Sequence, residues 1–154
     1  MPALGPPDVL PAALVPDLEG RPRPLDELWT PGGGLLVVGH ADCGTTRLAL
    51  PYLERIHRGG GRVAVILQED EAGARAVVAN HRLTLPVRLD VDPYRLSEAL
   101  ALETVPTHYH VDAGGAVLEI LQGFRGDAYE RLALALGAPS PFRPGDTVPA
   151  LRPG

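Results

Sequence analysis

The stretch that decides the fold covers residues 37–46 and reads VVGHADCGTT. Its first two residues, together with the two leucines before them, form a short continuous apolar run that ends in a turn. Such a run is typical of a strand buried on both faces. Apolar residues then recur at helical spacing from about residue 43 to residue 58, at Leu48, Tyr52, Leu53 and Ile56. The sequence therefore places Cys43 at the first turn of a helix that follows directly from a buried strand.

Strands and helices alternate along the rest of the chain. Outside this stretch, the pattern predicts a hairpin of residues 13–17 and 21–25, strands at 63–67 and 86–89, helices at 70–81 and 97–102, a second hairpin of residues 107–111 and 117–121, and a helix at 128–136. Gly137 stands where a C-terminal stop is expected. This order predicts an α/β fold in which helices flank a central mixed sheet.

Proline marks both ends of the chain. Ten of the 17 prolines lie in residues 1–16 and 137–154. Because proline lacks a backbone N–H and has a fixed φ, we expect irregular, loosely packed segments there. The predicted organisation is a proline-rich arm at 1–9, one domain at 10–137, and a proline-rich tail at 138–154.

Composition restricts the class of function. The chain has 154 residues, a net charge of −5 and no lysine, and its 14 arginines are scattered, so no basic stripe indicates nucleic-acid binding. A single cysteine excludes an internal disulfide and favours a reducing compartment. Prolines interrupt the N-terminal apolar residues, and no apolar run is long enough to span a bilayer. We expect a cytoplasmic protein without a cofactor, with an oligomer left open.

The stretch around Cys43 resembles the active-site turn of the thioredoxin superfamily, with Cys-x-x-Thr in place of Cys-x-x-Cys. Pro51, eight residues after Cys43, matches the proline that kinks that family's active-site helix. Val105-Pro106-Thr107 opens the late hairpin and resembles the family's cis-proline loop. The glycines of the late hairpin and Gly123 follow in the family's order. The resemblance covers roughly residues 10–136 and implies a thioredoxin-like three-layer sandwich.

The early hairpin, with the extra helix and strand between residues 69 and 89, resembles the redoxin branch, which includes peroxiredoxins and thioredoxin-like reductases. Several positions depart from the family pattern. Thr46 replaces the resolving cysteine, and Val37 stands where many members bury an acid. Peroxiredoxins need Thr or Ser three residues before the reactive cysteine and an earlier proline, where this chain has His40 and Leu36. The peroxidase pattern therefore fails.

The position of Cys43 favours a reactive thiol. Backbone N–H groups of Gly44, Thr45 and Thr46 would point at the sulfur, and the helix dipole adds positive potential. The Thr46 hydroxyl can also donate to the thiolate, whereas the neighbouring carboxylate of Asp42 opposes it. We expect the helix to prevail if Asp42 is solvated.

The resemblance implies a monothiol thiol–disulfide oxidoreductase. Cys43 would be the nucleophile with Thr46 as its hydrogen-bond partner, and the substrate-facing residues would be Gly44, Thr45, Val105, Pro106 and Thr107. Its partners would be a disulfide or mixed-disulfide protein and a low-molecular-weight thiol that completes the exchange. Two alternatives stay open: a redox-inactive binding module in which Cys43 is a relic, and a one-cysteine peroxidase.

Three histidines raise the question of a metal. His108 and His110 alternate along one predicted strand and so point to the same face, and His40 precedes Cys43 by three residues. Imidazole and thiolate suit copper or zinc. The spacing does not bring three or four ligands together, so we expect no metal site and interpret these histidines as polar or half-exposed.

Overall fold

The computed structural model describes residue 6 and residues 8–154. Its central sheet contains β3 (Gly34–Gly39), β4 (Val63–Leu67), β5 (Val87–Leu89), β6 (Thr107–Val111) and β7 (Val117–Gln122) in the order β5-β4-β3-β6-β7. The first three run parallel, whereas β6 is antiparallel to both β3 and β7. The expected mixed sheet is therefore confirmed.

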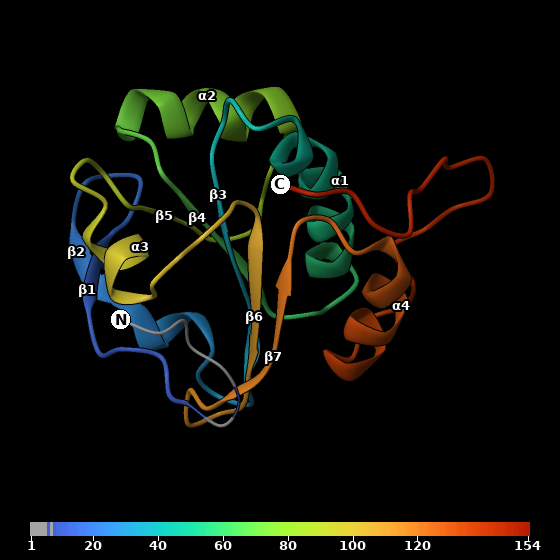
Figure 1. Ribbon diagram of the computed structural model, residues 1–154, viewed down its shortest axis with the longest axis horizontal. Coiled ribbons are helices and arrows are strands. Elements are labelled where there is room, and N and C mark those ends of the chain that lie inside the picture. The colour runs from blue at the N-terminus through green and yellow to red at the C-terminus, as the bar shows by residue number, and fades with distance from the viewer. Residues whose placement is uncertain (1–5, 7) are drawn as a thin grey trace.

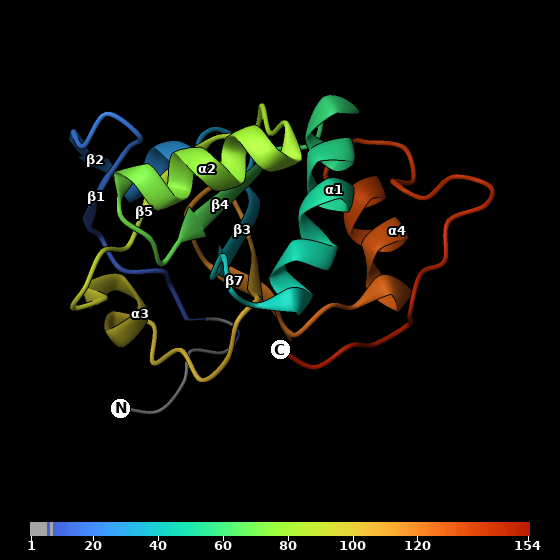
Figure 2. The ribbon, with the colours of Figure 1, turned by 90° about the horizontal axis from the view of Figure 1, so that it is seen from above.

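The helices form a layer on each side of the sheet (Figures 1 and 2). They are α1 (Gly44–Arg58), α2 (Glu71–His81), α3 (Arg95–Ala99) and α4 (Gly126–Ala135), with a 3-10 turn at Leu25–Leu28. Residues of α1, α2 and α4 share one apolar cluster with Val37 and Val65, while α3 and the 3-10 turn share the other with Val38 and Ile66. Alternate residues of β3 and β4 thus face opposite cores, as expected of strands buried on both sides.

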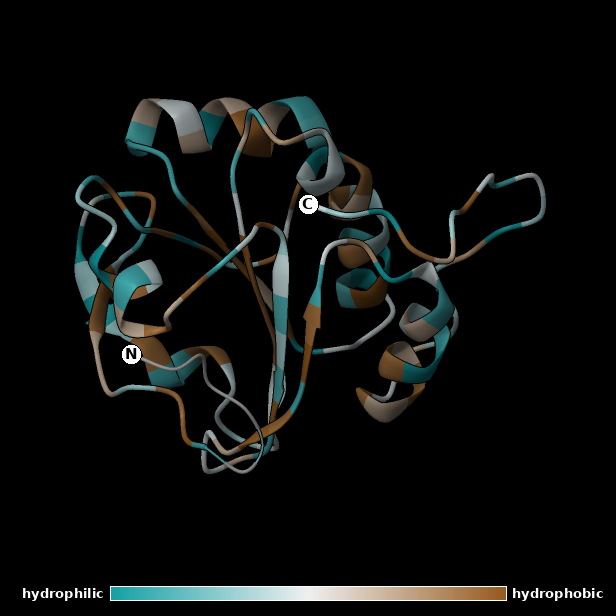
Figure 3. Cartoon of the chain, in the orientation of Figure 1, coloured by the Kyte–Doolittle hydropathy of each residue, from teal (hydrophilic) through white to brown (hydrophobic). Residues whose placement is uncertain are grey.

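Hydrophobic stretches recur along the central strands, although most of β6 is pale to hydrophilic (Figure 3). Every residue of β3 and β4 is buried. The buried strands predicted from the apolar runs at 35–38 and 63–67 are both confirmed. The early hairpin, β1 (Leu14–Pro16) with β2 (Pro22–Pro24), forms a separate two-stranded sheet, so its prolines do not interrupt the central ladder.

Two predicted helices have wrong boundaries. The helix predicted at 97–102 is α3, which begins at Arg95 and ends at Ala99. The Asp90 carboxylate, at the end of β5, accepts hydrogen bonds from the backbone N–H groups of Leu96 and Ser97 at 3.1 and 2.9 Å. The final helix begins at Gly126 rather than Ala128, and Gly137, at φ +82°, confirms the predicted stop.

The tail at 138–154 is not loosely packed as expected. Phe142 makes an edge contact with the Tyr52 ring at a centroid distance of 5.2 Å, and Asp146 pairs with Arg55 of α1 at 2.8 Å. The chain then returns from α4 toward the start of α1 (Figure 2). The arm expected at 1–9 lies mostly outside the described residues, although Val9 forms a bridge with Ala116. Among the helices of the described residues, none combines the length and apolar character needed to cross a bilayer.

Candidate functional site

Cys43 is the N-cap of α1. Its backbone has extended geometry, with φ −85° and ψ 117°, and its carbonyl oxygen accepts from the N–H of Arg47 at 3.0 Å. Its own N–H donates to the carbonyl of His40 at 3.1 Å, which closes the turn after β3. The side chain is half-buried. The thiol therefore stands where the unpaired N–H groups of the first helical turn gather.

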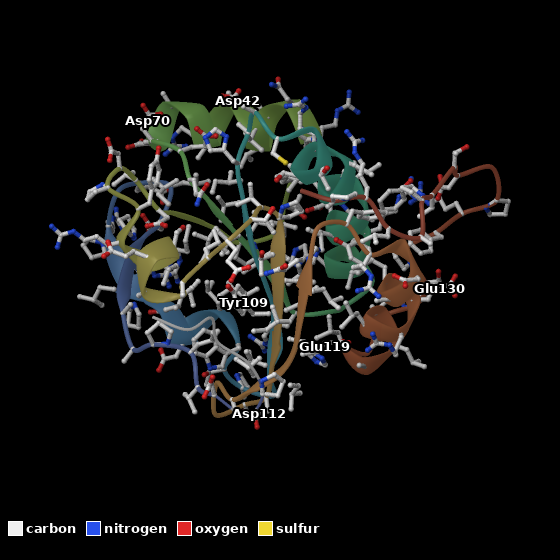
Figure 4. All side chains as sticks on the ribbon, viewed as in Figure 1. Asp42, Asp70, Tyr109, Asp112, Glu119 and Glu130 are labelled. Atoms are coloured by element: carbon white, nitrogen blue, oxygen red, sulfur yellow. The ribbon has the colours of Figure 1, made fainter. Side chains whose placement is uncertain are left out.

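The surroundings of Cys43 favour its thiolate. Burial raises the pKa of the Cys43 thiol, but hydrogen bonds from the backbone and hydroxyl of Thr46, followed by the backbone N–H of Thr45, outweigh it and lower the pKa below that of an ordinary thiol. Asp42 is exposed. Figure 4 labels Asp42 at the end of the sheet where β3 leads into α1. That the helix terminus prevails over this carboxylate stays a prediction, which the measured pKa of the Cys43 thiol tests.

Thr46 is held firmly beneath the thiol. Its side chain is only 1% exposed. A Cβ atom at Gly39 would come within 2.6 Å of the Thr46 methyl carbon, so only glycine allows β3 to pass this close. The His40 N–H points at the Thr46 hydroxyl oxygen over 3.4 Å, which uses that oxygen as an acceptor and leaves its proton to be donated.

The loop before β6 lies directly against the thiol. The Val105–Pro106 peptide bond is cis. The sulfur of Cys43 lies 3.5 Å from the Val105 carbonyl oxygen, to which the protonated thiol donates. The Pro106 carbonyl accepts from the N–H of Gly123 at 2.8 Å, which fixes the loop to the end of β7. Segments 62 residues apart in sequence therefore meet at the sulfur.

The other predicted site residues occupy different positions. Gly44 is half-buried next to Cys43, and the Thr45 side chain is buried. Pro106 and Thr107 are buried as well, and the Thr107 hydroxyl donates to the Thr104 carbonyl at 2.7 Å. Only the backbone of Thr107, paired within the sheet, belongs to the site.

The three histidines do not converge. His108 is buried, with one ring nitrogen on the Leu121 carbonyl and the other on the Tyr129 hydroxyl. Burial lowers the pKa of His108 to about 4, so it is neutral near pH 7. His40 instead accepts from the N–H of Asp42 at 3.0 Å. Within residue 6 and residues 8–154, no three His, Cys, Asp or Glu side chains are placed to hold a metal ion.

The tail contributes contacts that sequence reasoning missed. The Thr45 hydroxyl donates to the Pro153 carbonyl at 2.6 Å, and a Cβ atom at Gly44 would lie 3.0 Å from the Arg152 guanidinium. A Cβ atom at Gly154 would overlap the Val105 carbonyl oxygen. No local pattern in the sequence signals these contacts, since each joins segments far apart in the chain, 108 residues for Thr45 and Pro153.

Comparison with known proteins supports the fold. No protein-family model and no curated protein sequence matches the chain. Among solved structures, a putative thiol:disulfide interchange protein DsbE from Chlorobium tepidum is 21% identical, with a TM-score of 0.74 over 86% of this chain and 96% of that one. A thio-disulfide isomerase from Thermus thermophilus is also 21% identical, with a TM-score of 0.69 over 88% and 99%. The thioredoxin domain of a thiol-disulfide oxidoreductase from Bacteroides vulgatus is 18% identical, with a TM-score of 0.74 over 87% and 99%. At these identities the likeness concerns architecture alone, and it establishes that this chain has the thioredoxin-like fold.

Proposed function

We propose that the protein is a monothiol thiol–disulfide oxidoreductase that acts through Cys43. The observation that carries the proposal is the contact of 3.5 Å between the Cys43 sulfur and the Val105 carbonyl, at the N-terminus of a 15-residue helix. A thiol with a lowered pKa thus lies beside backbone that an extended polypeptide can pair with. The structures of similar fold, which carry the names of disulfide oxidoreductases and isomerases, support the same chemistry.

The proposed reaction has two exchanges. The Cys43 thiolate attacks the sulfur of the low-molecular-weight thiol in a protein mixed disulfide. A new S–S bond forms between this sulfur and Cys43, the old one breaks, and the protein thiol leaves as a thiolate that takes up a proton. A second low-molecular-weight thiolate then attacks the mixed disulfide on Cys43 and releases a low-molecular-weight disulfide. No other cysteine is present to resolve it, and Thr46, in the position three residues on, carries a hydroxyl. A reducing compartment such as the cytoplasm would supply the second thiol.

The test is to incubate the protein with a glutathionylated model protein and excess glutathione. We expect release of the model protein thiol, a mass increase of one glutathione on Cys43 when no free glutathione is added, and loss of both signals in Cys43→Ser. Leu118→Ala, on the exposed side of β7, is the matched control and should behave as the wild type. A Cys43→Ser variant as fast as the wild type would overturn the proposal.

The alternatives predict other outcomes. A one-cysteine peroxidase would consume hydrogen peroxide, which we do not expect because His40 and Leu36 replace the residues that the peroxidase pattern needs. A redox-inactive binding module would show no glutathione transfer at all, and the cellular activity of the Cys43→Ser variant would equal that of the wild type.

A further inference from the structure

The segment Pro149–Gly154, which we call the strap, crosses the surface between α4 and the start of α1 (Figure 2). It runs as extended backbone beside residues 124–127: Arg152 exchanges two hydrogen bonds with Phe124 at 2.8 and 2.9 Å, and the Ala150 carbonyl accepts from the N–H of Asp127 at 3.2 Å. The strap therefore lies on the protein as an added edge strand does.

The far end of the strap covers the cis-proline loop. The Pro153 carbonyl accepts from the Thr45 hydroxyl at 2.6 Å, and Gly154 packs so closely that a side chain there would overlap the Val105 carbonyl oxygen. Val105 is also the residue whose carbonyl lies 3.5 Å from the Cys43 sulfur. Polypeptide backbone thus already occupies the edge beside the thiol.

The strap is anchored at its base and exposed along its length. Asp146, just before it, accepts from Arg55 of α1 at 2.8 Å and from the Arg143 N–H at 2.7 Å. By contrast, the residues of the strap from Ala150 onward are exposed, Leu151 by 58%. A segment that is anchored at one end and held elsewhere by a few surface hydrogen bonds can open without disturbing the core.

The strap and the Cys43 thiolate also compete for one hydrogen-bond donor, the Thr45 hydroxyl. The Thr45 hydroxyl has one proton, which it donates either to the Pro153 carbonyl or to the Cys43 sulfur. While the strap is closed the proton is directed to Pro153. Opening frees both the backbone edge at Val105 and this donor.

We propose that the strap is an intramolecular competitor that occupies the backbone edge at Val105 beside Cys43, which we call the peptide groove, so that extended polypeptides reach the thiol only when the strap opens. The inference rests on the proposed function and adds its regulation. The strap itself, an extended backbone held mainly through main-chain carbonyls, indicates what fits this groove.

The test compares two alkylating probes on Cys43, at about pH 10 where an ordinary thiol is largely ionised. One is iodoacetamide, and the other is a maleimide carried by a six-residue alanine–proline peptide. Arg152→Pro removes the N–H that donates to Phe124, whereas Arg152→Ala keeps that N–H and removes only the guanidinium. Losing one such hydrogen bond should raise the population of the open strap, and hence the ratio of the peptide-probe rate to the iodoacetamide rate, about five-fold.

We expect this rise in Arg152→Pro, a smaller one in Asp146→Ala, and none in Arg152→Ala. Rate ratios within two-fold of the wild type in both Arg152→Pro and Asp146→Ala would overturn the proposal that the strap excludes polypeptides from Cys43. The outcome does not depend on catalysis, because any ionised thiol is alkylated. If the ratio responds but the wild type transfers no glutathione, the strap stands and the oxidoreductase proposal fails.

Discussion

Replacing Thr46 by valine should slow the reaction of Cys43 below its pKa. Valine is nearly isosteric, so the methyl contact against Gly39 is retained while the hydroxyl that donates to the thiolate is lost. Thr46→Ser is the matched control, since serine keeps the hydroxyl and loses the methyl group. The backbone N–H of residue 46 remains in both variants, so only one of the donors is removed.

The expected magnitude follows from one hydrogen bond to a charged group. Such bonds contribute about 1.5–3 kcal/mol when shielded. Cys43 is half-buried, so water replaces part of the lost interaction, and we take about 1 kcal/mol as the net loss of thiolate stabilisation. That corresponds to about five-fold less thiolate, and hence about five-fold slower alkylation, at any pH well below the thiol pKa.

The assay is the rate of alkylation by iodoacetamide between pH 5 and 10. The wild type and Thr46→Val should reach similar rates at high pH, where both thiols are ionised, and diverge at low pH. Thr46→Ser should follow the wild type. A Thr46→Val profile that superimposes on the wild type, or a Thr46→Ser profile as slow as valine, would show that the hydroxyl does not hold the thiolate.

Three further outcomes follow from buried polar groups and from the glycine beneath the site. His108 has a pKa of about 4 in the folded state against ~6.5 in the unfolded state, so it binds its proton more weakly when folded. The free energy of unfolding, measured with urea, should therefore fall by up to about 3 kcal/mol between pH 6.5 and 4. His108→Gln should flatten that fall. Glu54 is buried and accepts four hydrogen bonds, which lower its pKa although burial raises it. Glu54→Gln should therefore lower the free energy of unfolding in urea at pH 7 by about 2 kcal/mol. The control Glu71→Gln, at an exposed position, should lower it by less than about 0.5 kcal/mol. Gly39→Ala should displace Thr46, costing about 1–3 kcal/mol and slowing neutral alkylation of Cys43; an unchanged rate would place the Thr46 side chain elsewhere.

The parts of the fold that the sequence predicted well are those whose hydrogen bonds and burial are visible locally. The limits of β4 and β6 match the expected ranges because alternating or continuous apolar residues define them. The place of Cys43 follows in the same way, since it stands at the junction of a strand and a helix. The place of Pro106 was predicted from the family resemblance. Elements whose first backbone N–H groups have partners outside the element were placed less accurately.

The start of α3 shows why. Asp90 supplies the acceptor for two N–H groups of that helix from the end of β5, and Tyr94 turns the chain with φ +58°. Neither feature has a local periodicity. Likewise, the N–H of Asp127 at the start of α4 donates to Ala150, which comes 23 residues later. Such partners outside the helix accompany a first residue that lies two positions before the predicted one in both α3 and α4.

The tail differs from the prediction for a different physical reason. Its prolines predict loose packing, because proline cannot donate to a ladder. In the strap, the residues that pair are the ones between the prolines, and Pro153 takes part through its carbonyl. Edge pairing needs donors at alternate positions only, so a segment with spaced prolines can still bind as an edge strand.

Because the chain has a single cysteine, the strap would affect the two exchanges of the proposed reaction differently. A thiol three residues on would resolve the mixed disulfide from within, whatever covered the groove. Thr46 carries a hydroxyl instead, so in the proposed mechanism the second exchange would depend on a thiol that enters from solution. Each of the strap's few hydrogen bonds contributes about 1 kcal/mol net, and together they suffice to keep the open form a minority while allowing it to form repeatedly. The same opening would then admit a polypeptide disulfide for the first exchange, whereas a small thiol needs much less of the groove for the second. Slow entry of large substrates with ready entry of small thiols would keep Cys43 reduced between encounters.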